Sequence, residues 1–252
     1  MSKYRRNILI ASSIGGGGSW YRICEGGIYT KIEGTYINSK ATWFNSKQYE
    51  IISEVKILVG GYSYQRQYLG SSDKRSYYIA QSFNQISHPR ELNETFSNGI
   101  MNDTGIRSLM AYKPFIGKKI RFGWPKTNSG EKAYIQFFEN GVWGEKIHAT
   151  SQYSDGNYTV GNPFYIFAYN FGWSIGSEGY NAQDIAIYKV IFRNKDIDIR
   201  SFIACQLIQN ISADLAWDNK VHQAGEYGMY DEVTGKFYGD ANSTGYFLEN
   251  FD

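Results

Sequence analysis

Two pairs of acidic residues have the spacing that a carboxylate-based glycan hydrolase requires. Asp196 and Asp198 are two residues apart, and Glu50 and Glu54 are four apart, so each pair would share one face of a β-strand. Glycoside hydrolysis needs two such groups at a defined separation. However, acidic side chains in this setting are usually solvated surface residues, and the first pair falls at an expected turn. We therefore interpret both pairs as surface residues, and a glycan-degrading enzyme acting through Asp198 is the weaker alternative.

The histidines and cysteines form no motif for a metal or for a nucleophile. His88, His148 and His222 are scattered, with no His-x-x-x-His or Cys-x-x-Cys spacing, which argues against a zinc site. Cys24 and Cys205 are too few for a disulfide framework, and we expect two buried free thiols made in a reducing cytoplasm. A single bridge between them and a Cys24–His dyad stay open as alternatives.

Two further segments suggest ligand chemistry only weakly. Asn102–Asp103 and Asp155–Asn157 offer oxygen ligands for calcium, but capping of turns explains these residues equally well. Gly15–Gly18 lacks both the Lys-Ser/Thr ending and the preceding strand of a phosphate-binding loop. We predict no catalytic residue, no metal and no cofactor.

Tryptophan side chains can bind a sugar by stacking on its apolar face. Two of them are expected in exposed loops: Trp143 follows the turn Asn140–Gly141, and Trp173 lies in a glycine-rich segment, 171–176. We predict Trp143 and Trp173 as ligand-binding residues, with packing in the core or at a subunit interface as the alternative. The pool of tryptophans considered for this role is Trp43, Trp124, Trp143, Trp173 and Trp217.

The composition favours an all-β fold that binds no nucleic acid. Aromatic residues make up 17% of the 252 residues, and 27 glycines but only 4 prolines are available for turns. The net charge of +2, from 26 basic and 24 acidic residues, gives no basic footprint for nucleic acid. No stretch is long and apolar enough to cross a membrane.

Short β-strands separated by turns recur along the chain without a long amphipathic helical window. The clearest strand is 184–192, whose alternation predicts Ile185, Ile187, Lys189 and Ile191 on one face and the intervening residues on the other. This pattern is typical of an antiparallel two-sheet sandwich or barrel. The expected strands are 49–59, 76–83, 119–124, 133–138, 164–169 (buried on both faces), 184–192 and 197–203.

The N-terminal segment is predicted to be a docking arm. Residues 1–14 are basic and then apolar, the apolar run is too short for a signal peptide, and four glycines follow as a flexible joint. We divide the chain into an arm with its joint, residues 1–19, and a sandwich, residues 20–252. A frayed terminus is the alternative. The residues expected to dock are Lys3, Tyr4, Arg5, Arg6, Ile8 and Leu9.

The segment Gly228–Phe247 resembles the closing motif of a family of concanavalin A-like (laminin-G-like) domains common in phage and prophage proteins of gut bacteria. Gly34–Ser39, Phe164–Asn170 and Asp184–Cys205 resemble three other parts of that family, so the resemblance covers about residues 34–247. The closing motif is fairly specific and the opening one is weak. The chain departs from the family at 85–115 and 206–226, which look like an insertion and a lengthened loop.

Independently of the family, Tyr230–Tyr238 predicts two short strands around a Thr-Gly turn. Asp231 can cap this turn, and Phe237 and Tyr238 are expected to close the core.

The resemblance implies an all-β, antiparallel jelly-roll sandwich and a non-enzymatic structural protein of a tailed bacteriophage particle, such as a capsid decoration, head fibre or tail component. It implies several copies in an assembly, with other capsid or tail subunits as partners through residues 1–18. A glycan-binding protein for host attachment on the virion is the alternative.

Overall fold

The computed structural model describes residues 20–32, 34–42, 48–58, 66–71, 78–83, 94–101, 107–110, 117–126, 129–131, 134–148, 162–170, 185–241 and 246–251. Within these ranges the chain is built of β-strands, with one short 3-10 helix, η2 (Ala213–Leu215). The all-β expectation is therefore confirmed.

The larger sheet has 12 strands among the described residues, in the order β11-β10-β9-β4-β15-β16-β17-β18, and the neighbours along this path are antiparallel. The other four strands pair with members of this path or with each other: β12 pairs with β10, β1 pairs with β16, and β2 links β15 to β19. The strands are β1 (Tyr21–Ile23), β2 (Ile28–Thr30), β4 (Tyr49–Ile57), β9 (Lys119–Trp124), β10 (Tyr134–Glu139), β11 (Val142–Trp143), β12 (Ile147–His148), β15 (Ile185–Asn194), β16 (Ile197–Leu207), β17 (Tyr227–Asp231), β18 (Lys236–Tyr238) and β19 (Phe247–Glu249).

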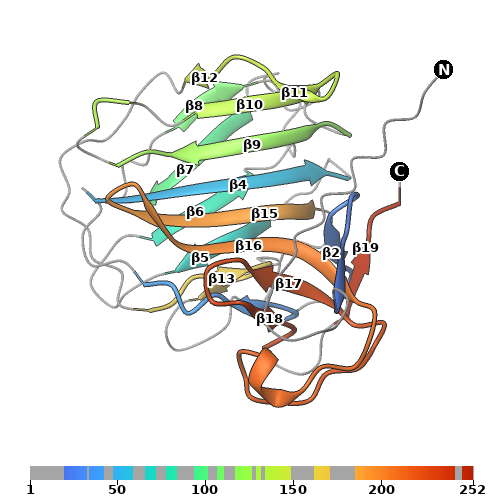
Figure 1. The fold of residues 1–252 in the computed structure, drawn as a ribbon. Helices are drawn as coiled ribbons and strands as arrows, with labels where there is room; N and C mark the ends of the chain where they lie inside the picture. Colours follow the sequence, from blue (N-terminus) through green and yellow to red (C-terminus); the bar gives the residue numbers. More distant parts are fainter. Residues whose placement is uncertain are drawn as a thin grey trace.

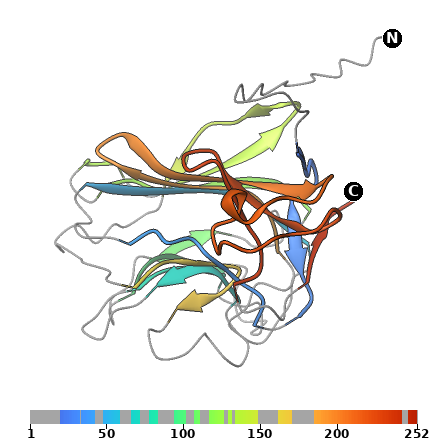
Figure 2. The same cartoon turned by 60° about the horizontal axis from the view of Figure 1, so that its bottom comes forward.

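The smaller sheet has seven strands among the described residues, in the order β3-β13-β5-β6-β7-β8, with β14 pairing to β5 in parallel. The two sheets lie one above the other as layers (Figures 1 and 2). Two strands of this sheet, β7 and β8, come from the predicted insertion 85–115. The strands are β3 (Ile37–Asn38), β5 (Arg66–Ser71), β6 (Tyr78–Phe83), β7 (Glu94–Met101), β8 (Arg107–Met110), β13 (Tyr165–Ile166) and β14 (Tyr169–Asn170).

The core lies between the sheets, and we call the face of the larger sheet that covers it the inner face. Phe122, Phe192 and Phe202 contribute from the larger sheet, and Phe164 and Ile166 contribute from the smaller layer. All five are at most 1% exposed, and the Phe164 and Phe192 ring centroids are 5.3 Å apart. Rings of this size dominate core energetics, so contacts across the layers hold the sheets together.

Strand β15 corrects the predicted alternation. Its pairing with β4 shifts register between Ile187 and Lys189, so Tyr188 has no partner in this ladder. An extra residue of this kind, a β-bulge, reverses the faces of all later residues. Val190 and Phe192 therefore join Ile187 in the core, and the prediction that Lys189 shares the face of Ile187 is wrong.

The aromatic segment 164–169 is two short strands, not one. Phe167 adopts a left-handed backbone with φ of 70°, which breaks the extended chain between β13 and β14. The bend still keeps Phe164, Ile166, Phe167 and Ala168 fully buried. The expected burial is met at these four residues but not at Tyr165, which is half-buried.

Two predicted hairpin turns form as expected. Asn140 and Gly141 connect β10 to β11 with φ of 53° and 83°, and Lys195 and Asp196 connect β15 to β16 with φ of 49° and 71°. Positive φ at both central residues matches the twist of the flanking strands.

The closing hairpin β17–β18 is held by a buried carboxylate. Asp231 is 0% exposed, and its Oδ1 accepts hydrogen bonds from the backbone N–H groups of Ser201 (2.9 Å) and Val233 (3.1 Å). Its Oδ2 accepts a hydrogen bond from the Thr234 hydroxyl at 2.7 Å and lies 3.6 Å from Nε of Arg200. The predicted role of Asp231 as the cap of this turn is confirmed.

Candidate functional site

The acidic pair Asp196 and Asp198 lies at the β15–β16 hairpin, and each carboxylate has a separate cationic partner. Lys126 Nζ is 2.7 Å from Asp196, and Arg193 Nε is 2.6 Å from Asp198. The Asp196 side chain is 77% exposed. Two separately paired carboxylates at a turn fit the interpretation as surface residues.

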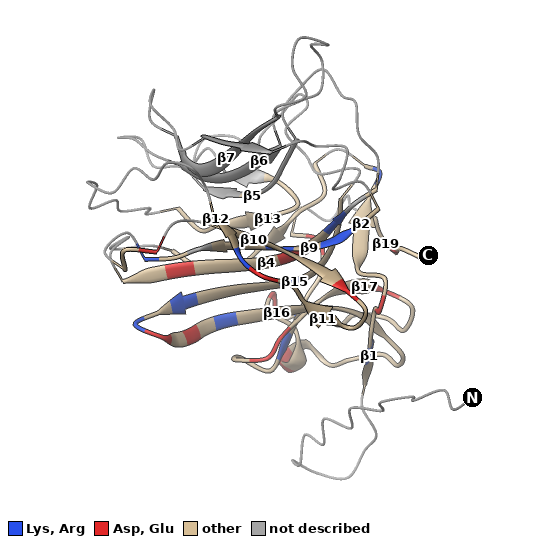
Figure 3. Cartoon of the chain, turned by 90° about the horizontal axis from the view of Figure 1, so that it is seen from above, with Lys and Arg blue, Asp and Glu red and all other residues tan. Residues whose placement is uncertain are grey.

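Glu50 and Glu54 lie on the face of β4 that points away from the smaller sheet, which we call the outer face. Arg193 NH1 is 3.2 Å from Glu50, and Arg121 NH2 is 2.7 Å from Glu54. Figure 3 shows acidic and basic residues close together on the strands of this sheet. Both glutamate side chains form ion pairs and are only 14% exposed. They are therefore less solvated than the interpretation as surface residues implies.

Trp143, a predicted ligand-binding residue, is half-buried on the outer face, where it packs against Phe138 with ring centroids 5.0 Å apart. The guanidinium of Arg121 lies 4.0 Å from the Trp143 ring centroid, and Lys119 Nζ lies 5.8 Å from it. Burial lowers the pKa of Lys119. This aromatic and charged cluster is a candidate surface for a polar ligand, although Arg121 already lies over the Trp143 ring.

The segment 206–226, predicted to be a lengthened loop, folds around His222. Its Nδ1 is 2.7 Å from Glu226 Oε2, and its Nε2 is 3.1 Å from Asp218 Oδ1. The ring also meets the edge of Phe237, a fully buried residue of β18. His222 thus ties two parts of the loop to the closing hairpin. With carboxylates on both ring nitrogens, it has the arrangement of a structural cross-link.

The last strand of the closing motif packs as predicted. Phe237 and Tyr238 are 0% and 3% exposed, and the ring of Trp217 stacks on Tyr238 with centroids 5.8 Å apart. Lys40 Nζ lies 4.4 Å from the centroid of the Trp217 ring. Trp217 therefore belongs to the rim of the core.

Both cysteines are free and buried, as expected. Burial raises the pKa of the Cys24 thiol to about 12 and that of Cys205 well above its usual range. Cys24 lies beside Glu249, whereas His222 is held by its two carboxylates and His148 is exposed beside Tyr134. Among the described residues the Cys24–His dyad is therefore not formed.

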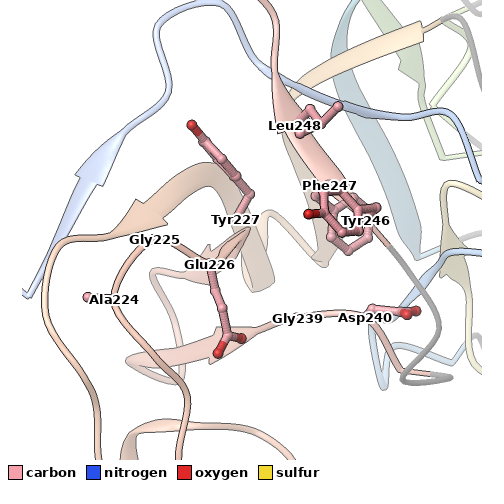
Figure 4. A pocket seen from close by; sticks show the side chains of 9 residues that line it. All are labelled: Ala224, Gly225, Glu226, Tyr227, Gly239, Asp240, Tyr246, Phe247 and Leu248. Atoms are coloured by element: carbon pink, nitrogen blue, oxygen red, sulfur yellow. The ribbon is translucent and has the colours of Figure 1, made fainter.

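A cleft of about 540 Å³ opens beside the start of β17. Three separate segments line it, and Figure 4 shows Tyr227, Glu226 and the Tyr246–Phe247 pair around it. Tyr246 is 62% exposed, and the side chain of Glu226 is 40% exposed. The lining residues are Ala224, Gly225, Glu226, Tyr227, Gly239, Asp240, Tyr246, Phe247 and Leu248.

The cleft combines aromatic walls with negative charge. Glu226 and Asp240 are acidic, and none of the nine lining residues is a lysine, arginine or histidine. Both carboxylates are positioned by the backbone: Gln223 N–H donates to Glu226 Oε1 at 2.5 Å, and Tyr36 N–H donates to Asp240 Oδ1 at 3.3 Å. Fixed carboxylates beside exposed aromatic rings suit a cationic group.

Several predicted residues lie outside the described residues: Trp43, Trp173, His88, the calcium candidates Asn102–Asp103 and Asp155–Asn157, and the arm residues Lys3, Tyr4, Arg5, Arg6, Ile8 and Leu9. Trp124 is placed in β9, but its side chain is not described. These predictions stay open.

Comparisons with protein-family models, with curated proteins and with solved structures each gave no match to this chain. Across the described part of the chain, no group of three or more His, Cys, Asp or Glu side chains could hold a metal ion. The same residues include no helix of sufficient length and apolarity for a membrane span.

The cleft residues Glu226, Asp240 and Tyr246 were not among the sequence-predicted site residues. Glu226 lies in the segment 206–226, where the sequence departs from the family that it resembles. This departure was the one sequence feature that pointed to Glu226. Asp240 and Tyr246 flank the end of the closing motif, and only the pairing of β19 with β2 brings Tyr246 beside β17.

Proposed function

We propose that this chain is a non-enzymatic structural protein of a tailed bacteriophage particle, built on a concanavalin A-like jelly-roll sandwich and docked through its N-terminal arm. The observation that carries the proposal is the closing segment Gly228–Phe247. The sequence of this segment resembles phage domains, and in the structure it forms a hairpin that turns around the buried Asp231 and places Phe237 and Tyr238 against the core.

The arrangement of the acidic residues supports a binding role over a catalytic one. The two pairs with hydrolase spacing are engaged in ion pairs with Lys126, Arg193 and Arg121. A catalytic acid needs a raised pKa, which a neighbouring cation opposes. The aromatic and charged outer face is better suited to contact a partner.

Deleting residues 1–18 tests the proposal, because the sandwich should fold without them. Particles assembled with the truncated chain should lack it, whereas a chain with Glu139→Gln, a change of an exposed carboxylate, should be incorporated normally. Incorporation of the truncated chain at the normal copy number would refute the docking role of the arm.

A host-attachment protein that binds glycan is the second candidate, and the position of Trp143 favours it. The ring is half-buried on the outer face beside Arg121 and Glu54, which could bind sugar hydroxyls. Glycan-array binding lost in Trp143→Ala or Trp173→Ala would support it. Absence of binding to every host polysaccharide tested would count against it.

A further inference from the structure

We propose that the cleft lined by Glu226, Tyr227, Asp240 and Tyr246 receives the basic N-terminal arm of a second copy of this chain. The inference rests on the proposed docking role of the arm and names its partner. It assigns the cleft a ligand class, an extended peptide with lysine or arginine side chains.

The charges of the cleft and the arm are complementary. The cleft presents two carboxylates and no basic side chain among its nine lining residues. The arm carries Lys3, Arg5 and Arg6, and the first acidic residue of the chain is Glu25. Glu226 also pairs with His222 through Oε2, but a carboxylate has about four lone-pair sites, so both groups can accept a further hydrogen bond from a guanidinium or ammonium.

The apolar residues of the cleft and of the arm also match. Tyr246, Phe247 and Leu248 form one side of the cleft, and Tyr246 is 62% exposed. In the arm, Ile8 and Leu9 follow the basic residues directly. An extended segment can therefore place cations near the carboxylates and aliphatic side chains on the aromatic wall.

The place where the described chain begins favours a second copy. Trp20 and Tyr21 pack against Tyr230 on the outer face, with ring centroids 4.5 Å apart for Tyr21 and Tyr230. Tyr227, in contrast, packs against the main core on the inner face. The described chain therefore begins on the face opposite Tyr227, which favours the arm of a neighbouring copy over the chain's own arm.

The arm is long enough to bridge two molecules. Residues 1–19 precede Trp20, and an extended chain of this length spans up to about 60 Å. Since an arm and a cleft are different surfaces, the contact is head-to-tail and can repeat along a row of copies.

A complementation experiment tests the proposal with two full-length variants. The cleft variant carries Glu226→Gln with Tyr246→Ser, and the arm variant carries Lys3→Gln, Arg5→Gln and Arg6→Gln. Light scattering during size-exclusion chromatography should show that the wild-type chain self-associates with rising concentration and that each variant alone is monomeric. Mixed together they should form only a 1:1 complex, because one supplies the arm and the other the cleft.

A titration of a labelled peptide of residues 1–14 into the arm variant supplies the affinity. Glu226→Gln alone should weaken binding by about tenfold, and raised salt should weaken it further. Glu139→Gln, an exposed carboxylate change on β10, is the control and should have no effect.

A wild-type chain that stays monomeric and a peptide that does not bind would overturn the inference, as would an arm that binds only its own cleft without complementation. Loss of truncated chains from particles together with a monomeric wild type would refute this inference and leave the docking role intact.

Discussion

Replacing Asp231 with alanine should destabilise the protein more than any other single substitution of a buried polar residue in the closing hairpin. The side chain is 0% exposed and accepts from Ser201 N–H, Val233 N–H and the Thr234 hydroxyl, and it lies 3.6 Å from Arg200. The change leaves two N–H groups and a hydroxyl without this acceptor, and it removes the negative charge beside the Arg200 guanidinium.

The loss in the free energy of unfolding follows from the hydrogen-bond donors that Asp231→Ala leaves without an acceptor. Hydrogen bonds to a charged group contribute about 1.5–3 kcal/mol each, but these share one carboxylate and do not add. The remaining Arg200 is 27% exposed and is not left as a fully buried charge, so the cost comes from the donors that lose their acceptor, and we expect about 3–5 kcal/mol for Asp231→Ala. For a chain of this size, that corresponds to a fall in Tm of about 6–20 °C.

Thermal unfolding followed by circular dichroism measures the change, with urea titration giving the free energy of unfolding. Asp196→Asn removes a negative charge from a side chain that is 77% exposed at another hairpin, keeps a residue that tolerates the positive φ, and should change the free energy by less than about 0.5 kcal/mol. A Tm for Asp231→Ala within 2 °C of the wild type would refute the account of how the hairpin is held.

Three further perturbations address the core and its titrating groups. Phe164→Ala removes a fully buried ring that bridges the two layers and should lower the free energy of unfolding by about 3–5 kcal/mol in urea titrations; a cost under 1 kcal/mol would mean that the layers do not share this core. Cys24 and Cys205 should not react with a thiol reagent at pH 8 in the native state and should both react in guanidinium, because burial raises both pKa values; rapid native labelling would contradict this. Burial, with Tyr165 alongside, raises the pKa of Tyr36 to about 12 from 10.0, so its stabilising effect is complete below pH 10 and is lost as the pH rises towards 12. Stability measured across this window should fall less steeply in Tyr36→Phe, and an unchanged slope would argue against the assignment.

Local patterns predicted the hairpins well because their determinants are close in sequence. Asn140–Gly141 supplies the positive φ values that a two-residue turn needs, and Asp231 reaches the backbone of Val233 two residues away. These features require no knowledge of the rest of the fold. The same holds for strand 119–124, where Ile120 and Phe122 are buried as the alternation indicates.

The pairing of strands that are far apart in the chain could not be predicted from the sequence. The bulge in β15 depends on its register with β4, and no residue type marks it in the sequence. The bend at Phe167 places a non-glycine residue in the left-handed region, which propensity argues against. The cleft brings together 224–227, 239–240 and 246–248, and the last of these segments is fixed by the pairing of β19 with β2.

A cryo-electron microscopy reconstruction of particles of the phage proposed to carry this chain tests the central proposal most directly. The account predicts copies of the two-layered sandwich on the particle, each attached through residues 1–18 to a neighbouring subunit. A particle without the chain would contradict it, and so would a sandwich attached through other surfaces with its arm in solvent.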